Sequence, residues 1–187
     1  MNGIFGKAVA FAFRAHDGQL RKDGTLFILH PLETAAIVGT MTNDEEVLAA
    51  AVLHDTVEDT SVTAEDILAN FGERVAELVA HETENKRRGK DPSETWMIRK
   101  VESLAVLKDS SVECKMLWLG DKLSNIRSFS RAQDRSPDTV FDLFNEKDPK
   151  KHRWYYATVL EYIKELSEYP AYKELETLCH KVFGKYE

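Results

Sequence analysis

Residues 47–60 read VLAAAVLHDTVEDT, and this stretch decides the fold. From Leu48 to Leu53 every side chain is apolar, which predicts a helix that is buried on all sides and has no polar face. The polar half follows at once, so a histidine and three carboxylates stand at the buried end of that helix. Burying such groups without a cation is costly, and this favours a bound metal ion.

The spacing of the polar residues in this stretch predicts which side chains lie on the same helix face. A helical turn would place Glu58 over His54 and Asp59 over Asp55. Adjacent residues on a helix point about 100° apart, so His54 and Asp55 reach one ion only at a helix end or across a cleft.

The rest of the chain is also helical in pattern, without the clean alternation of strands. We expect helices at 5–15, 30–38, 44–53, 63–71, 75–79, 93–107, 112–129, 140–144, 154–166 and 172–183. The prediction is an all-α fold of roughly ten helices in a single domain over 1–187. The motif-bearing core would span 8–129, with C-terminal helices at 151–187 packed on it. The polar segment 82–94 is expected to be a mobile loop.

Charge is unevenly spread along the chain. It has 187 residues, 25 Lys and Arg, 32 Asp and Glu, and a formal net charge of −7. From Asp23 to Glu73 there are 11 acids and no Lys or Arg. This window is either a solvated acidic face or a site whose carboxylates bind a cation. An acidic chain argues against a nucleic-acid polymer as partner, which needs a basic surface.

The sequence shows no membrane span and no signal peptide. No apolar run reaches the ~18 residues of a membrane span, and the start of the chain lacks the features of a signal peptide. Cys114 and Cys179 lie far apart and outside any C-x-x-C pair, so we expect reduced thiols. The expectation is a cytoplasmic protein with no membrane association, for which a homo-oligomer is left open.

Two further residues complete a candidate metal site. His30 follows an apolar run at the start of a predicted helix, and Asp121 lies in an otherwise apolar helical segment. With His54 and Asp55 they offer two nitrogens and two carboxylates. That mixture suits Mn²⁺, Fe²⁺ or Zn²⁺ better than Mg²⁺ or Ca²⁺.

Each candidate has a simpler interpretation when it is taken alone. His30 is ordinary at a helix start, where its ring can bond to the backbone. Asp121 could pair with a cation on its own helix, and Glu58 and Asp59 could be solvated acids at a helix end. The combination of all of them in one chain favours the metal site.

The combination also resembles a known family. His30, His54-Asp55 and Asp121 match the H…HD…D signature of the HD phosphohydrolase superfamily. More narrowly, the chain resembles the hydrolase domain of the RelA/SpoT enzymes, especially the short single-domain form, the metazoan SpoT homologue. The matching stretches are AHDGQ at 15–19, RK at 21–22, HPL at 30–32, HDTVEDT at 54–60 and GDKLSNIR at 120–127.

The resemblance implies a fold and a reaction. The fold would be an HD-domain helical bundle, with no synthetase domain after Glu187. The reaction would be metal-dependent removal of the 3′-pyrophosphate of ppGpp or pppGpp, giving GDP or GTP.

It also implies roles for individual residues. The metal, commonly Mn²⁺ in this family, would be held by His30, His54, Asp55 and Asp121. Glu58 and Asp59 would be the catalytic acids that handle the attacking water. The nucleotide would be bound by Arg21, Lys22, Asn125, Arg153 and Tyr156.

Some segments depart from the family pattern. Residues 80–83 read AHET where relatives usually have G-V-T, and Gly120 replaces a usual alanine, which we expect to be a small change. The following Lys86-Arg87-Arg88 is either a phosphate contact or a solvated basic loop, and we favour the loop. The charged segment 131–151 is expected at the mouth of the pocket.

Two other functions remain open at this stage. One is an HD phosphohydrolase that attacks a phosphomonoester of another nucleotide such as NADPH. The other is a nucleotide-binding regulatory module with a structural metal. Glu58 and Asp59 argue against the second, because a pure binder needs no acids beside its metal.

Overall fold

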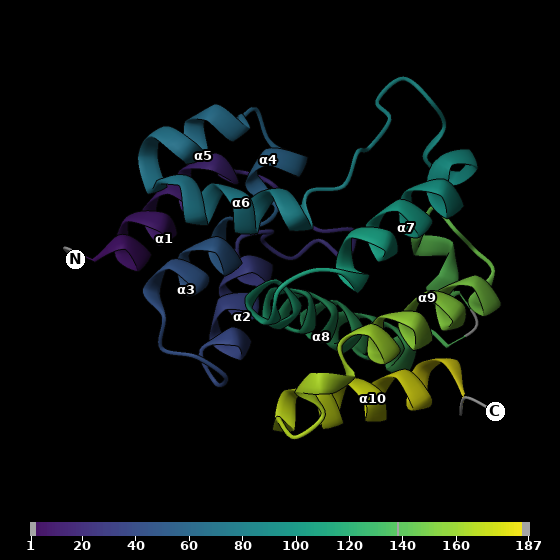
Figure 1. Cartoon of the computed structure of the whole chain (residues 1–187). Helices are drawn as coiled ribbons and strands as arrows, with labels where there is room; N and C mark the ends of the chain where they lie inside the picture. Colours follow the sequence, from purple (N-terminus) through teal and green to yellow (C-terminus); the bar gives the residue numbers. More distant parts are fainter. Residues whose placement is uncertain (1–2, 138, 185–187) are drawn as a thin grey trace.

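The computed structural model describes residues 3–137 and 139–184, and most of the residues in these ranges are helical (Figure 1). The only β-type pairing within them is an isolated bridge between Leu20 and Leu26. The elements are α1 (Ile4–Ala15), α2 (Leu29–Val38), α3 (Glu45–Leu53), α4 (Thr56–Asp59), α5 (Ala64–Phe71), α6 (Glu73–Glu82), α7 (Pro92–Lys108), α8 (Val112–Arg135), the 3₁₀ turn η1 (Val140–Leu143), α9 (Pro149–Tyr162), the 3₁₀ turn η2 (Lys164–Leu166) and α10 (Pro170–Phe183). The prediction of an all-α bundle of about ten helices is confirmed. The last three residues of the predicted C-terminal segment, 185–187, lie outside the described ranges.

Helix α8 is the central element of the bundle. It packs against α2 on one flank and α10 on the other (Figure 1). Gly120 lies where α8 crosses α2, and a Cβ there would come within 2.8 Å of Val38 Cγ2 and 3.0 Å of the Thr34 carbonyl oxygen. Gly120 is therefore a point of close helix approach, and the expectation that it is a small change was wrong.

Helix α3 is buried along most of its length, as its apolar sequence predicts. Asp44 caps its N-terminus by accepting hydrogen bonds from the backbone N–H groups of Glu46 and Val47. The helix ends at Leu53, and Asp55 is the residue before the short helix α4. His54 and Asp55 thus form the corner between two helices, where neighbouring side chains can face one point.

Helices α7 and α9 begin earlier than the sequence suggested, and each begins at a proline. Helix α7 begins at Pro92 with Asp91 as its cap, and not after Ser93. Helix α9 likewise begins at Pro149, capped by Asp148, several residues before Trp154. Proline lacks a backbone N–H and has a fixed φ, so it suits the first helical position, where the N–H has no partner in the helix.

Side chains stabilise the start of α5. Thr63 and Asp66 form the reciprocal capping box at the start of α5. None of the helices in the described ranges combines the length and the apolar character that crossing a membrane requires.

Candidate active site

Four side chains from three parts of the chain converge in the interior of the bundle. His30 comes from the first turn of α2, His54 and Asp55 from the corner between α3 and α4, and Asp121 from the middle of α8. His30 Nε2 lies 3.1 Å from Asp121 Oδ1 and 3.4 Å from Asp55 Oδ2. His54 Nε2 lies 3.2 Å from the same oxygen of Asp55 and 3.7 Å from Asp121 Oδ1. The four residues proposed from the sequence as ligands therefore meet at one place.

The far sides of both imidazole rings are occupied. His54 Nδ1 lies 2.8 Å from the Ala51 carbonyl oxygen, which can only accept a hydrogen bond. His30 Nδ1 lies 2.8 Å from Ser124 Oγ, which itself donates to Glu33. This hydrogen-bond network assigns the proton to Nδ1 in each ring and leaves the Nε2 lone pair pointing inward. Such backing of a ligand histidine is usual in metal sites.

The donor set fits a divalent metal. One atom from each of His30, His54 and Asp121 lies within 4.8 Å of the others, and all three residues are buried. The His54 Nε2 atom is buried and has no hydrogen-bond partner. A buried, partnerless lone pair facing carboxylates is costly on its own, and a cation removes that cost.

The electrostatics of the cluster also attract a cation. Burial opposes a charge on His54, but Asp55 and Asp121 raise the pKa of its ring well above the ordinary value. Burial likewise works against the charge on Asp55, yet the two histidines hold its pKa well below the usual range. The carboxylates therefore stay charged in the interior.

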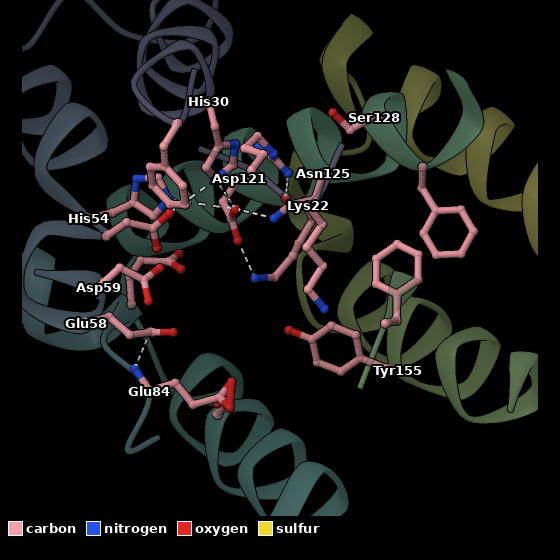
Figure 2. Close-up of a pocket in the computed structure, with 18 of the residues that line it drawn as sticks. Lys22, His30, His54, Glu58, Asp59, Glu84, Asp121, Asn125, Ser128 and Tyr155 are labelled. Carbon is pink, nitrogen blue, oxygen red and sulfur yellow. Dashed lines mark hydrogen bonds and ion pairs between the residues drawn. The ribbon is translucent and has the colours of Figure 1, made fainter. Parts of the chain in front are cut away.

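The two candidate catalytic acids lie beside this cluster on α4. Glu58, Asp59 and His54 face the cavity from the same side (Figure 2). Burial and the neighbouring Asp55 raise the pKa of Glu58, and Lys86 offsets part of this effect.

Lys86 is the largest surprise of the site. Its Nζ lies 2.9 Å from Glu58 Oε1 and 2.7 Å from Asp59 Oδ1, so one cation bridges both acids. The preference for a solvated basic loop at 86–88 was therefore wrong for this residue. The only signal in the sequence was an excess of cations, which does not say where a loop will fold back.

The opposite wall carries the residues expected to bind a nucleotide. Arg21 donates a hydrogen bond of 2.8 Å to the Asn125 side-chain oxygen, and Asn125 donates to Asp121 Oδ1 at 2.5 Å. Lys22 lies over the Phe144 ring, 5.4 Å from its centre, and burial together with Lys86 lowers its pKa.

The other two nucleotide candidates differ in placement. Tyr156 is buried and lines the cavity, and burial raises its pKa well above the usual value. Arg153 is on the same helix, α9, but is not among the residues that line the cavity. Substrate contact by Tyr156 is thus geometrically favoured over contact by Arg153.

These walls enclose a cavity of about 410 Å³. That volume is within the range of small-molecule sites. The sequence analysis missed several of its lining residues: Glu82, Glu84, Trp96, Lys100, Trp118, Lys122 and Tyr155. Most come from α7 and its preceding loop or from α8, where no spacing rule links them to the HD motif.

Lys122 is the missed residue nearest to the cluster. Its ammonium group contacts Asp121 Oδ2 and lies over the Trp118 ring, 4.4 Å from its centre. Asp121 therefore has the cation partner that its simpler interpretation suggested, as well as the two histidines.

Comparison with known proteins agrees with this geometry. The family model of the HD domain matches residues 8–146. The chain is 31% identical to a GTP pyrophosphokinase of Myxococcus xanthus over 134 residues, covering 70% of this chain and 18% of that protein. It is 38% identical to a guanosine-3′,5′-bis(diphosphate) 3′-pyrophosphohydrolase of Aquifex aeolicus (strain VF5) over 122 residues, covering 65% and 17%. The chain thus spans less than a fifth of the length of these relatives.

Solved structures are similar over more of their length. One, described as a metazoan ortholog of SpoT that hydrolyzes ppGpp, has a TM-score of 0.78 and 25% identity, covering 99% of this chain and 98% of that one. A structure from Listeria monocytogenes EGD-e has a TM-score of 0.71 and 34% identity, covering 83% and 94%. The resemblance inferred from the sequence motifs is confirmed.

Proposed function

This chain belongs to the HD-domain family, and from that premise we propose that it is a metal-dependent hydrolase that removes the 3′-pyrophosphate of ppGpp or pppGpp. The products are GDP or GTP and pyrophosphate. The observation that carries the proposal is the convergence of two histidines, two aspartates and two further acids on one cavity. A site that only bound a nucleotide would have no use for the acids on α4.

The reaction is a displacement at phosphorus. A water oxygen forms a bond to the phosphorus next to the ribose, and the bond from that phosphorus to the ribose 3′ oxygen breaks. The water loses a proton and the ribose oxygen gains one. Glu58 is proposed to take the proton and Asp59 to orient the water, because both face the cavity beside the cluster. Such general base catalysis commonly contributes about 10²–10⁴-fold.

The ligand cluster prepares this step. A divalent ion held by His30, His54, Asp55 and Asp121 would supply Lewis acidity, which polarises a phosphoryl oxygen and makes water more acidic. The protein itself holds Nδ1 of the two rings through Ser124 and the Ala51 carbonyl group, so that Nε2 of each ring faces the other ligands.

The far wall is proposed to receive the rest of the nucleotide. Arg21 can grip a phosphate with two N–H groups or stack on the base, and Lys22 adds a point charge. Asn125 lies between Arg21 and Asp121, so it can couple substrate contact to the ligand cluster. Arg153 and Tyr156 on α9 are assigned to the same nucleotide.

Three finer assignments belong to the same proposal. The ion is assigned as Mn²⁺, which the mixed nitrogen and oxygen donors support. A cytoplasmic location is supported by two cysteines that are buried as thiols. The chain is taken as one domain.

The proposal is tested by product analysis. Protein loaded with Mn²⁺ should release pyrophosphate from ppGpp. Asp55→Ala should lose metal and activity together, by more than the roughly 10–100-fold that loss of a group behind a ligand costs. Pyrophosphate release by metal-stripped Asp55→Ala would contradict the proposal. Inorganic phosphate released from NADPH in place of pyrophosphate from ppGpp would move the substrate to another nucleotide.

A further inference from the structure

The loop at residues 83–91, between α6 and α7, folds back onto α4. The backbone N–H of Glu84 donates to Glu58 Oε2 at 2.8 Å (Figure 2). Lys86 contacts the other oxygen of the same carboxylate, and Arg88 donates to the Glu58 backbone carbonyl group at 3.1 Å. Both oxygens of Glu58 are thus held by one loop.

The side chain of Glu84 points the other way, to α7. Its two carboxylate oxygens receive Arg99 and Lys100, the latter at 2.7 Å. Arg99 is fixed in turn by the Thr95 hydroxyl group at 3.3 Å and the Pro92 carbonyl group at 3.2 Å. Glu84 therefore anchors the loop on α7 through two cations.

This tie differs from the other ion pair of the same loop. The Glu84 and Arg99 side chains are 9% and 8% exposed, whereas Glu102, which pairs with Arg87, is 51% exposed. Burial works against a charge on Glu84, yet Lys100 and Arg99 hold its pKa below the usual value. A surface pair contributes little to rigidity, while removing one partner of a buried pair leaves an uncompensated charge.

We infer that Glu84 is a positioning residue for Glu58. Its carboxylate anchors the loop on α7, and its backbone N–H then holds Glu58 Oε2, so that the carboxylate is aimed at the attacking water. Arg99 is the partner in this anchor, although it is not among the residues that line the cavity. This inference rests on the proposed role of Glu58 in hydrolysis.

If Glu84 positions Glu58, loss of the anchor should lower kcat more than it changes KM. Glu58 must lie within hydrogen-bond reach of its water during the reaction, so a loosened carboxylate lowers kcat. The residues that we propose to bind the nucleotide lie on other walls of the cavity, so KM should change little. Loss of a group behind a catalytic or ligand residue typically costs about 10–100-fold, and we expect a fall near the lower end.

The variants are chosen to keep size and fold. Glu84→Gln retains the length of the side chain and the backbone N–H but loses the charge that holds Arg99 and Lys100. Arg99→Gln breaks the same tie from α7 and carries the test if Glu84→Gln does not fold. Glu102→Gln is the matched control, because it removes an exposed pair of the same loop and helix.

Two readouts are combined on metal-loaded protein. Steady-state kinetics give kcat and KM on both ppGpp and NADPH, and limited trypsin digestion followed by mass spectrometry gives the cleavage rate at residues 86–88. We expect about a 10-fold lower kcat in both tie variants with KM within two-fold. Cleavage at 86–88 should be faster, and the double variant should fall no further than either single variant. Glu102→Gln should match the wild-type protein in kcat and KM.

The inference is overturned if kcat stays within two-fold of wild type, if only KM rises, or if the two variants act additively. Turnover of NADPH but not of ppGpp by the wild-type protein would reject the proposed substrate. Because the same kcat, KM and cleavage rates are then measured with NADPH, Glu84 is still tested.

Discussion

His54 and Glu58 are one helical turn apart in the sequence, yet different kinds of structure hold them. His30 and Asp121 stand on buried helices, and His54 and Asp55 form the corner at the end of the buried helix α3. Each histidine ring is backed by a group of the core. Glu58 stands on a four-residue helix and is held by a loop through a backbone N–H and a lysine. The ligand half of the site is therefore part of the fold, while the acid half depends on contacts added to it.

This difference suggests how the two halves respond to change. Altering the ligand half should affect metal binding and stability together, because the same helices form the core. Altering the acid half should change the rate and its pH dependence and leave the metal in place. The predictions below probe each half in turn.

The largest effect is expected in the acid half. Glu58→Gln removes the proposed base but keeps its size and its hydrogen bond from Glu84. We expect kcat on ppGpp to fall by about 10²–10⁴-fold, the usual contribution of a general base. Bound metal, measured by elemental analysis, should be unchanged. Loss of the metal in this variant would show that the two halves are one unit.

The second prediction concerns Ser124, which contacts the His30 ring on the side away from the other ligands. Ser124→Ala leaves the His30 Nδ1 proton and one Glu33 carboxylate oxygen without their partner. We expect metal affinity to fall by about 10–100-fold, as for other groups that back a ligand histidine. Competition with a chromophoric chelator measures it. Ser128→Ala, one turn further along the same helix, is the control and should bind metal like the wild-type protein.

The sequence predicted the ligand half better than the acid half for a physical reason. His30, His54, Asp55 and Asp121 are marked by polar groups inside apolar helical segments, where burial makes a partner necessary. Helix periodicity then limits how such segments can pack. Lys86 has no such mark, because an exposed cation in a loop costs nothing wherever it points.

The predicted starts of two helices were wrong at aspartate-proline pairs. Pro92 and Pro149 lie outside the helices predicted from the sequence, yet each begins a helix behind an aspartate cap. The significance of Gly120 was also missed, since only the crossing of α2 and α8 shows that no Cβ fits there. Contacts between distant segments are not contained in local patterns.

That crossing gives the third prediction. Gly120→Ala should gain about 1 kcal/mol of helix propensity but lose more from overpacking against Val38 and Thr34, typically about 1–3 kcal/mol. Because α2 carries His30 and α8 carries Asp121, metal affinity should fall as well. Urea unfolding of the metal-free protein measures the first effect and chelator competition the second. A variant that is more stable than the wild-type protein would refute the close packing at Gly120.

The smallest effect is expected from Lys86→Met, and it tests whether the loop tunes the acid half. Burial and Asp55 raise the pKa of Glu58, and Lys86 lowers it, so removing the ammonium group should raise it further. A general base works in its deprotonated form, so a higher pKa moves the acidic limb of the kcat profile to higher pH. The Lys86 side chain is 37% exposed, and its effect on Glu58 is therefore partly screened by solvent and salt. Raising the ionic strength should shift the wild-type limb toward that of the variant and leave the variant almost unchanged. An acidic limb that moves to lower pH would mean that Lys86 acts on the substrate and not on Glu58.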